Sequence, residues 1–469
     1  MEIFKLSPDE YQSLLNEWKP DYNFFQSAAY ARRFQDDQEP FDVLAGYEDD
    51  KPVFGVIIAY QPALKIFSVA SSRREWVAFQ KPDDLKNEKL VKDFVDGIVA
   101  YLKSNKRVIF WSVESGVCLR ERDRNGAIVE GGFDNKDYRK MMEQIGFIPR
   151  TLWKGNWLVR QSRYISRIDL IKDPDTSGYP DSHPESHEWK SWNDLLEDMP
   201  GNQRRRMNGH PDLHVKEYEL DGVDMLHQML ETAGDLHGFS AMDKSQLESY
   251  VKSFKDDKKL LVAMLDLKSA YERQQQIYSE NGEKIEELEA VLKEKPQLKK
   301  KRSALNKAIQ EKDKAEEQMK QLVQLAANYN GGSLEGEIPA AASLFLLTPT
   351  ECIYLVGGSR HDMSHFNATY SIQKAMIKDS LENHRLRHNF WGISGFFEPG
   401  ETGYGVFNFK RLLGGVVSEY CGEFIYPLHP RLCEAYTKSL IEKEFMTAPE
   451  TDIDNPVEWI CTEESERNE

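Results

Sequence analysis

The stretch SLFLLTPTECIYLVGGS, residues 343–359, decides the fold of the second half of the chain. Its two apolar runs flank a Thr-Pro-Thr connection, which predicts a pair of buried β-strands. A helix is predicted next, over 367–383, followed by the turn NFWGISG at 389–395 and the segment GVFNFKRLLGGVVSEYCGEFIYPL at 405–428. Strands that alternate with helices in this way indicate a mixed α/β unit.

A long helical hairpin is predicted immediately upstream, at 266–328. Residues recur there at alternating spacings of four and three, the spacing typical of coiled coils, in two series: Leu267, Tyr271, Gln274, Tyr278, Asn281, Ile285, Leu288, Leu292, and Leu298, Leu305, Ala308, Lys312, Ala315, Met319, Leu322. Pro296 separates the series, so we expect the helices to reverse and pack antiparallel. The polar residues in the seam predict a bendable arm of about 40 Å, at about 1.5 Å per residue. The spacing alone fits an oligomer contact equally well.

The first half of the chain also reads as mixed α/β. Residues 41–61 predict two strands about an Asp-Asp-Lys-Pro turn, 86–105 an amphipathic helix and 108–115 a buried strand. A second α/β unit starts near residue 191 and is interrupted by the arm. We therefore predict a first domain at 1–153 and a second domain in two pieces, at 154–265 and 329–428. The coiled-coil arm is predicted at 266–328, and a C-terminal helix with an acidic tail at 429–469.

Composition limits the class of protein. The 469 residues are 40% hydrophobic and 30% charged, as in folded soluble proteins. Neither a long apolar run nor a signal peptide is recognisable, so a cytoplasmic location is expected. A net charge of −17 argues against a surface devoted to nucleic acid, although basic patches occur at Arg204–Arg206 and at LKKKR, 298–302. The five cysteines lack CxxC spacing and are expected to be buried, reduced thiols.

Motifs for cofactors and metals are missing from the sequence. No Walker, GxGxxG or GxSxG pattern occurs. The pairs His361/His365 and His384/His388 have helical spacing but no third ligand, so we expect them to be solvated and predict no metal site. No cofactor is predicted.

Lys410 is the strongest candidate for a chemical role. It lies in the aromatic context VFNFK, which predicts that its ammonium points into a cleft, where a cation can stabilise an oxyanion. A structural lysine with a buried aliphatic stem is the competing interpretation. Similarly, the run QRRRMN at 203–208 could bind a diphosphate or form a solvated charged face.

From FFQSAAYARRF (24–34) to GEFIYPL (422–428), the sequence resembles the Fem family of aminoacyl-tRNA-dependent peptidoglycan transferases. The residues that carry the resemblance occur in the family's order: Tyr354, Gly357, Gly358, Gln373, Met376, Trp391-Gly392-Ile393-Ser394-Gly395, Gly405-Val406, Phe409-Lys410 and Glu419-Tyr420-Cys421-Gly422. The resemblance implies two acetyltransferase-like (GNAT) domains with an inserted coiled-coil arm. It also implies transfer of an amino acid from aminoacyl-tRNA to the stem-peptide lysine, or to a preceding bridge residue, of lipid II.

The resemblance also assigns candidate site residues. Lys410 and the neighbouring Phe409 match the family's FK pair, and Lys410 is expected to act electrostatically at the reacting centre. Glu114 stands where the family has an Asp that orients or deprotonates the incoming amine. Arg204 and Arg206 match a segment linked with acceptor phosphates, and Tyr354 matches a cleft tyrosine.

Two further positions depart from the family pattern in the first domain. Tyr30 stands in place of a Trp. A lysine about four residues later is replaced by Phe34. Either Arg33 supplies its charge from the adjacent position, or the contact is absent.

Several alternatives stay open. An acyl-CoA N-acyltransferase of the GNAT type is disfavoured by the missing pyrophosphate loop, and a non-catalytic tRNA-binding or scaffold protein is disfavoured by the retained Lys410. The expected partners are aminoacyl-tRNA and lipid II at the inner face of the plasma membrane, where the enzyme would be peripheral. The sequence leaves open whether glycine, alanine or serine is transferred, and whether the arm contacts tRNA, a related transferase or a second copy.

Overall fold

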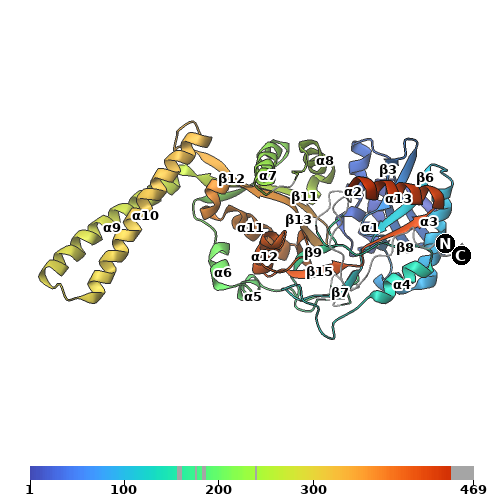
Figure 1. The fold of residues 1–469 in the computed structure, drawn as a ribbon, viewed down its shortest axis with the longest axis horizontal. Helices are drawn as coiled ribbons and strands as arrows, with labels where there is room; N and C mark the ends of the chain where they lie inside the picture. The colour runs from blue at the N-terminus through green and yellow to red at the C-terminus, as the bar shows by residue number, and fades with distance from the viewer. Residues whose placement is uncertain (156–160, 175–176, 182–185, 238–239, 445–469) are drawn as a thin grey trace.

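The computed structural model describes residues 1–155, 161–174, 177–181, 186–237 and 240–444. Two eight-stranded sheets form an elongated body, and a helical arm projects from one end of it (Figure 1). The acidic tail predicted after the last helix lies outside the described residues. None of the helices in the described ranges combines the length and the apolar character needed to span a lipid bilayer.

The first sheet has the strand order β1-β2-β3-β4-β6-β16-β8, with β5 beside β3. All neighbours are antiparallel except β4 and β6, which are parallel and are joined through helix α3. The bounds are β1 Glu2–Leu6, β2 Phe41–Glu48, β3 Lys51–Ala63, β4 Phe67–Ser72, β5 Val77–Ala78, β6 Val108–Glu114, β8 Ile148–Pro149 and β16 Glu423–Pro427, with helices α1 Pro8–Trp18, α2 Ala28–Asp36, α3 Glu88–Lys103, α4 Lys136–Gln144 and α13 Pro430–Glu444.

The second sheet has the order β10-β11-β12-β13-β14-β9-β15-β7 and also contains one parallel pair, β13 with β14, joined through helix α11. The bounds are β7 Cys118–Glu121, β9 Tyr164–Asp169, β10 Leu213–Tyr218, β11 Lys258–Asp266, β12 Glu337–Leu347, β13 Glu351–Ser359, β14 Arg387–Ile393 and β15 Val416–Tyr420. Its helices are α5 Trp192–Glu197, α6 Gly201–Met207, α7 Val223–His237, α8 Lys244–Phe254, α11 Ala368–Glu382 and α12 Tyr404–Leu412. The predicted strand pair and the helix after it correspond to β12, β13 and α11.

Two strands, β7 and β16, do not belong to the sheet that the predicted domain boundaries imply for them. β7, from the first part of the chain, pairs with β15 of the second sheet. β16, from near the C-terminus, lies between β6 and β8 of the first sheet. Local sequence patterns do not show these pairings, because β7 and β16 each pair with a strand about three hundred residues away.

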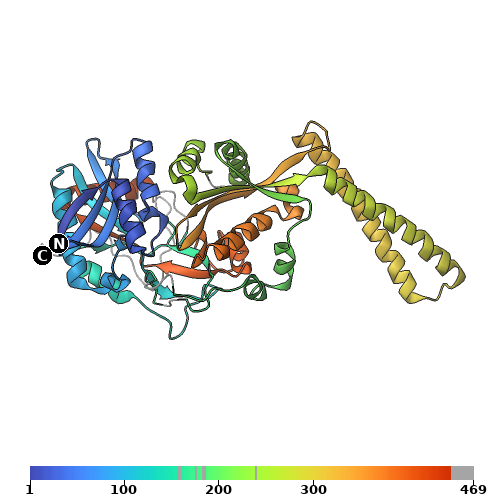
Figure 2. The same ribbon diagram turned by 180° about the vertical axis from the view of Figure 1, so that it is seen from behind.

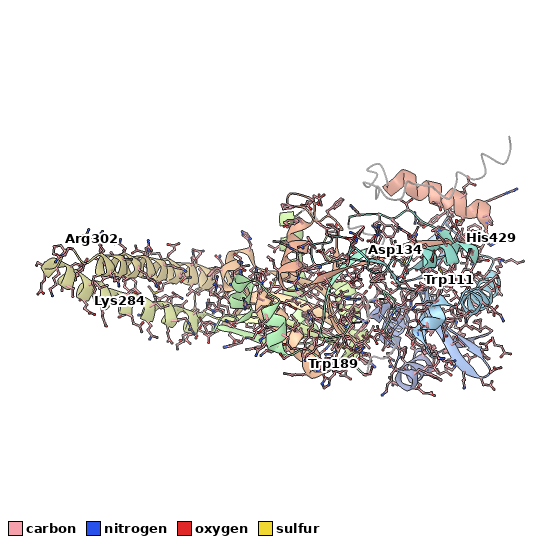
Figure 3. All side chains as sticks on the ribbon, turned by 90° about the horizontal axis from the view of Figure 1, so that it is seen from below. Trp111, Asp134, Trp189, Lys284, Arg302 and His429 are labelled. Carbon is pink, nitrogen blue, oxygen red and sulfur yellow. The ribbon has the colours of Figure 1, made fainter. Side chains whose placement is uncertain are left out.

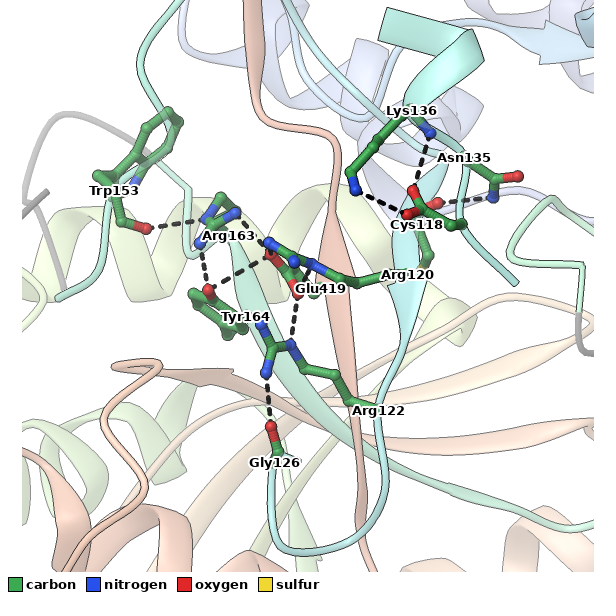
Figure 4. A network of polar contacts seen from close by, with 11 residues as sticks. Cys118, Arg120, Arg122, Gly126, Asn135, Lys136, Trp153, Arg163, Tyr164 and Glu419 are labelled. Atoms are coloured by element: carbon green, nitrogen blue, oxygen red, sulfur yellow. Dashed lines mark hydrogen bonds and ion pairs between the residues drawn. The ribbon is translucent and has the colours of Figure 1, made fainter. Parts of the chain in front are cut away.

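A buried ionic network fixes β7 in the second sheet (Figure 4). The carboxylate of Glu419 on β15 accepts hydrogen bonds from Arg120 Nε at 3.1 Å and from Arg163 Nη1 at 2.8 Å, and it also binds Arg122. The Glu419 side chain is fully buried. Because a buried carboxylate needs partners that offset its desolvation, three guanidiniums around one glutamate tie β7, β9 and β15 together.

The arm consists of α9, Leu267–Glu294, and α10, Lys299–Tyr329, which pack antiparallel (Figures 1 and 2). It interrupts the second sheet between the paired strands β11 and β12, and Asp266 caps α9 by accepting a hydrogen bond from the Ser269 N–H. Leu288, Ala308 and Ala315 are buried in the seam. The predicted coiled-coil arm is confirmed, and Arg302 lies at its far end (Figure 3).

Apolar packing joins the two halves of the body. The ring centroids of Phe24 and Phe25 lie 5.4 and 5.7 Å from that of Trp391, and Phe24 also lies 6.1 Å from Phe254. Helices α2 and α8 are further linked by a hydrogen bond from Ser253 Oγ to Asp36. Phe25 and Trp391 of this interface also line the cavity that is described in the next subsection.

Candidate active site

Lys410 is buried on α12, with 5% of its surface exposed. Its Nζ donates hydrogen bonds to the backbone carbonyl oxygens of Gly392 at 2.6 Å and Trp391 at 3.3 Å. Burial lowers the pKa of Lys410 to about 7. The side chain can therefore change its charge near neutral pH, which few lysines do.

The two carbonyl groups lie at the end of β14, in the segment that the sequence predicted to be a turn. That prediction is wrong for residues 389–393, which belong to the strand: Asn389, Gly392 and Ile393 pair with β9, and the register shifts at the two residues between Asn389 and Gly392. Trp391 has a positive φ of 67°, which is unusual for a bulky residue. A Cβ on Gly392 would approach Ser162 Oγ to 2.2 Å, so only glycine allows the strand to pass there.

A cavity of about 380 Å³ lies between the two halves of the body. Its wall includes Tyr30 and Arg33 from α2, Tyr250 from α8 and Trp391 from β14. Arg73, which follows β4, and Gln161 also line it. Two guanidinium groups and several aromatic rings thus face one enclosed space, which suits a ligand with both anionic and apolar parts.

Arg33 reaches this cavity over aromatic rings. Its guanidinium carbon lies 5.0 Å from the Tyr250 ring centroid and 5.4 Å from that of Phe34, and its Nε lies 3.6 Å from Asp37. Only 12% of the side chain is exposed. Arg33 thus places a guanidinium at the cavity wall, held by cation–π contacts.

Glu114 ends β6 beside the same cavity. Its Oε1 accepts a hydrogen bond from the backbone N–H of Gln161 at 3.1 Å, whereas Oε2 is buried with no hydrogen-bond partner among the described residues. Burial raises the pKa of Glu114, and the positive charge of Arg73 opposes that rise. A carboxylate with one unused oxygen and a raised pKa has the properties of a general base.

The remaining predicted residues lie apart from the cavity. Arg206 Nη1 donates to the Tyr370 hydroxyl at 3.1 Å, and the Tyr370 ring packs 5.5 Å from the ring of Phe409. Arg204 is exposed on α6. Tyr354 packs 5.3 Å from Phe345 and lines a separate hollow of about 200 Å³. Of the predicted site residues, Tyr30 and Arg33 line the cavity. Glu114 and Lys410 reach it only through backbone groups of the wall residues Gln161 and Trp391. Phe409, Arg204, Arg206 and Tyr354 lie elsewhere.

Arg73, Gln161 and Tyr250 are among the residues of the cavity wall that the sequence analysis did not identify. Arg73 offered the clearest signal, because it begins an Arg-Arg pair directly after the buried strand β4. Burial raises the pKa of Tyr30 to about 12, and the positive charges of Arg73 and Arg33 oppose this rise.

The histidines and cysteines contribute no metal site in the part of the chain that is described, where no three potential ligands converge. His388 contradicts the expectation of solvated histidines: it is fully buried in β14, and its Nε2 lies 2.9 Å from Gln373 Oε1. Burial lowers its pKa to about 3. Cys118, Cys352, Cys421 and Cys433 are buried, as predicted, and Cys461 lies outside the described residues.

Comparison with known proteins places the chain in a family. Residues 6–440 match the FemAB family. The chain belongs to this family. The aminoacyltransferase FemA of Staphylococcus aureus strain bovine RF122 / ET3-1 is 25% identical over 385 residues, which cover 80% of this chain and 83% of FemA. FemA of strain N315 shows the same identity and coverage.

The similarity to solved structures concerns the fold alone. A crystal structure of FemX aligns with a TM-score of 0.67 and 17% identity, covering 93% of this chain and 99% of FemX. A GCN5-related N-acetyltransferase from Kribbella flavida aligns with a TM-score of 0.31 and 7% identity over 93% of this chain and 73% of the acetyltransferase. The predicted family, fold class and class of enzyme, a tRNA-dependent aminoacyltransferase, are confirmed for this FemAB protein.

Proposed function

We propose that this FemAB protein transfers glycine, alanine or serine from aminoacyl-tRNA to the stem-peptide lysine of lipid II, or to a preceding bridge residue, at the inner face of the plasma membrane. The observation that supports this proposal best is the cavity between the two halves of the body, whose wall carries Arg33, Arg73 and Gln161. Glu114 binds the backbone N–H of Gln161 through one carboxylate oxygen, and its other oxygen has no hydrogen-bond partner among the described residues. Cations suit the anionic parts of a peptidoglycan precursor, and a carboxylate suits its amine.

The reaction is aminolysis of an ester. The neutral acceptor amine attacks the ester carbonyl, a C–N bond forms, and the bond from that carbon to the ribose oxygen breaks. Glu114 takes a proton from the amine, and the leaving ribose oxygen gains one. Because the ester is already activated, the protein mainly positions two substrates and stabilises charge.

In this proposal, Lys410 supplies the positive charge that stabilises the oxyanion. Its Nζ bonds to the Trp391 carbonyl, and Trp391 also lines the cavity. The pKa of Lys410 lies near 7, so a nearby oxyanion would shift Lys410 from the neutral amine to the charged ammonium form. Arg204 and Arg206, which lie on another face, stay predictions for contact with acceptor phosphates.

Transfer of radiolabelled glycine, alanine and serine from charged tRNA to lipid II tests the proposal with purified protein. We expect incorporation of one of the three, and loss of it in Lys410→Ala and Glu114→Gln. Acetyl-CoA as an alternative donor separates this activity from acyl-CoA transfer. Acetylation without aminoacyl transfer, or no incorporation from any charged tRNA, would contradict the proposal.

A further inference from the structure

The turn between β3 and β4 exposes two large apolar side chains. Ile66 is 68% exposed, the highest value among the large apolar residues described, and Leu64 is 37% exposed. Leu64 and Lys65 both have positive φ, 42° and 66°. Such turn positions favour Asn and Gly, so turn geometry does not explain why Leu and Lys stand there.

A basic groove adjoins this turn. The groove has a volume of about 680 Å³, and its wall contains three cations, Lys5, Lys65 and Arg107, but one acid, Asp42. Asp42 and Lys5 neutralise each other in an ion pair of 2.5 Å, and Asp42 also accepts a hydrogen bond from the Tyr60 hydroxyl at 2.5 Å. Lys65 and Arg107 therefore account for the excess positive charge of the groove wall. Lys103 and Lys106 are also exposed beside Arg107. In a chain of net charge −17, this local excess of positive charge marks a site for an anionic partner.

The groove also adjoins the candidate active site. Tyr60 and Gln61, at the end of β3, line both the groove and the cavity that contains Arg33. A substrate held in the cavity and anchored in a bilayer would need its lipid end to emerge at a surface that tolerates lipid. The β3–β4 turn offers that surface, with apolar side chains flanked by cations.

We propose that residues 61–68 form a membrane-docking hairpin, in which Leu64 and Ile66 enter the headgroup layer of an anionic bilayer while Lys65 and Arg107 contact lipid phosphates. This inference rests on the proposed function, because the lipid-linked acceptor explains why the hairpin adjoins the cavity. The basic tip of the arm lies at the opposite end of the molecule from the first sheet, so the two surfaces can be altered separately (Figure 1).

Cosedimentation with vesicles tests the hairpin. We expect the full-length protein to bind vesicles of phosphatidylcholine with phosphatidylglycerol, and to bind phosphatidylcholine alone weakly. Ile66→Asn should reduce binding to the anionic vesicles about tenfold, because the variant loses the burial of one large apolar side chain. Ile128→Asn is the matched control, since Ile128 is 51% exposed elsewhere on the body and should leave binding unchanged.

Three results would overturn the inference. They are equal binding by Ile66→Asn and the unchanged protein, loss of binding only when Lys300 and Lys301 on the arm are changed to Glu, and failure of the unchanged protein to bind anionic vesicles. The readout is independent of catalysis. Transfer to a water-soluble stem-peptide acceptor should persist in Ile66→Asn, so absence of that transfer in the unchanged protein would count against the proposed function instead.

Discussion

Lys410 Nζ lies 2.6 Å from the carbonyl oxygen of Gly392, and burial lowers the pKa of this lysine to about 7. α12 carries the lysine and β14 carries the carbonyl, so the contact joins the FK and FWGISG segments of the sequence. A lysine in this environment is poised between a cation and a neutral amine. Its charge can respond to what binds nearby.

Loss of the lysine should abolish most transfer. Lys410→Ala is expected to lower kcat by about 10²–10³-fold, the usual effect of removing a group that stabilises an oxyanion. In the unchanged enzyme, kcat/KM should decline above about pH 7, because the cationic form is lost from the free protein. Initial rates across pH measure both effects, and equal rates for Lys410→Ala would remove Lys410 from the mechanism.

The same pKa shift predicts a change in stability with pH. The folded-state pKa of about 7 lies below the value of about 10.4 for an unfolded lysine, so the unfolded chain binds more protons between these values. The free energy of unfolding of the protein, relative to Lys410→Met, should therefore rise between about pH 7 and pH 10. Urea unfolding at both ends of this window tests the sign. A relative stability that falls with pH would show that the lysine is charged when buried.

Glu114→Gln should lower transfer by about 10²-fold without unfolding the protein, because the amide cannot accept a proton from the amine. Glu114→Asp should retain part of the activity, since the carboxylate survives on a shorter side chain. Glu130→Gln is the matched control, because Glu130 is exposed and lies outside the cavity wall. Equal activity in Glu114→Gln and Glu130→Gln would assign Glu114 a structural role.

Arg33→Gln tests acceptor binding at the cavity. We expect KM for the acceptor to rise about tenfold with little change in kcat, the effect of losing one charge-assisted contact. Arg32 is the matched control: it is adjacent on α2 but pairs with the exposed Asp9. If Arg32→Gln and Arg33→Gln raise KM equally, the effect arises from the net charge of α2 rather than from the cavity.

The sequence predicted elements whose signals are local. The strands at 41–61 and the arm at 266–328 follow from apolar spacing and turn residues. The aromatic context of Lys410 predicted an ammonium that points into a cleft, whereas the structure buries it against the backbone carbonyls of Trp391 and Gly392. The cavity could not be predicted in this way, because Arg33, Arg73 and Trp391 come from three distant segments. Equally, no local pattern shows that β7 leaves the first sheet, since its register with β15 depends on side chains about three hundred residues apart.

Glu419 should be the residue on which that strand exchange depends. Glu419→Gln is expected to lower the free energy of unfolding by about 3–5 kcal/mol, because it removes the one carboxylate that Arg120, Arg122 and Arg163 share and leaves buried positive charge uncompensated. Glu188→Gln, which removes a 73% exposed partner of Lys172, should change stability by less than about 1 kcal/mol. Urea denaturation of both variants decides the matter: similar small losses would mean that apolar packing, and not the ionic network, holds β7 in the second sheet.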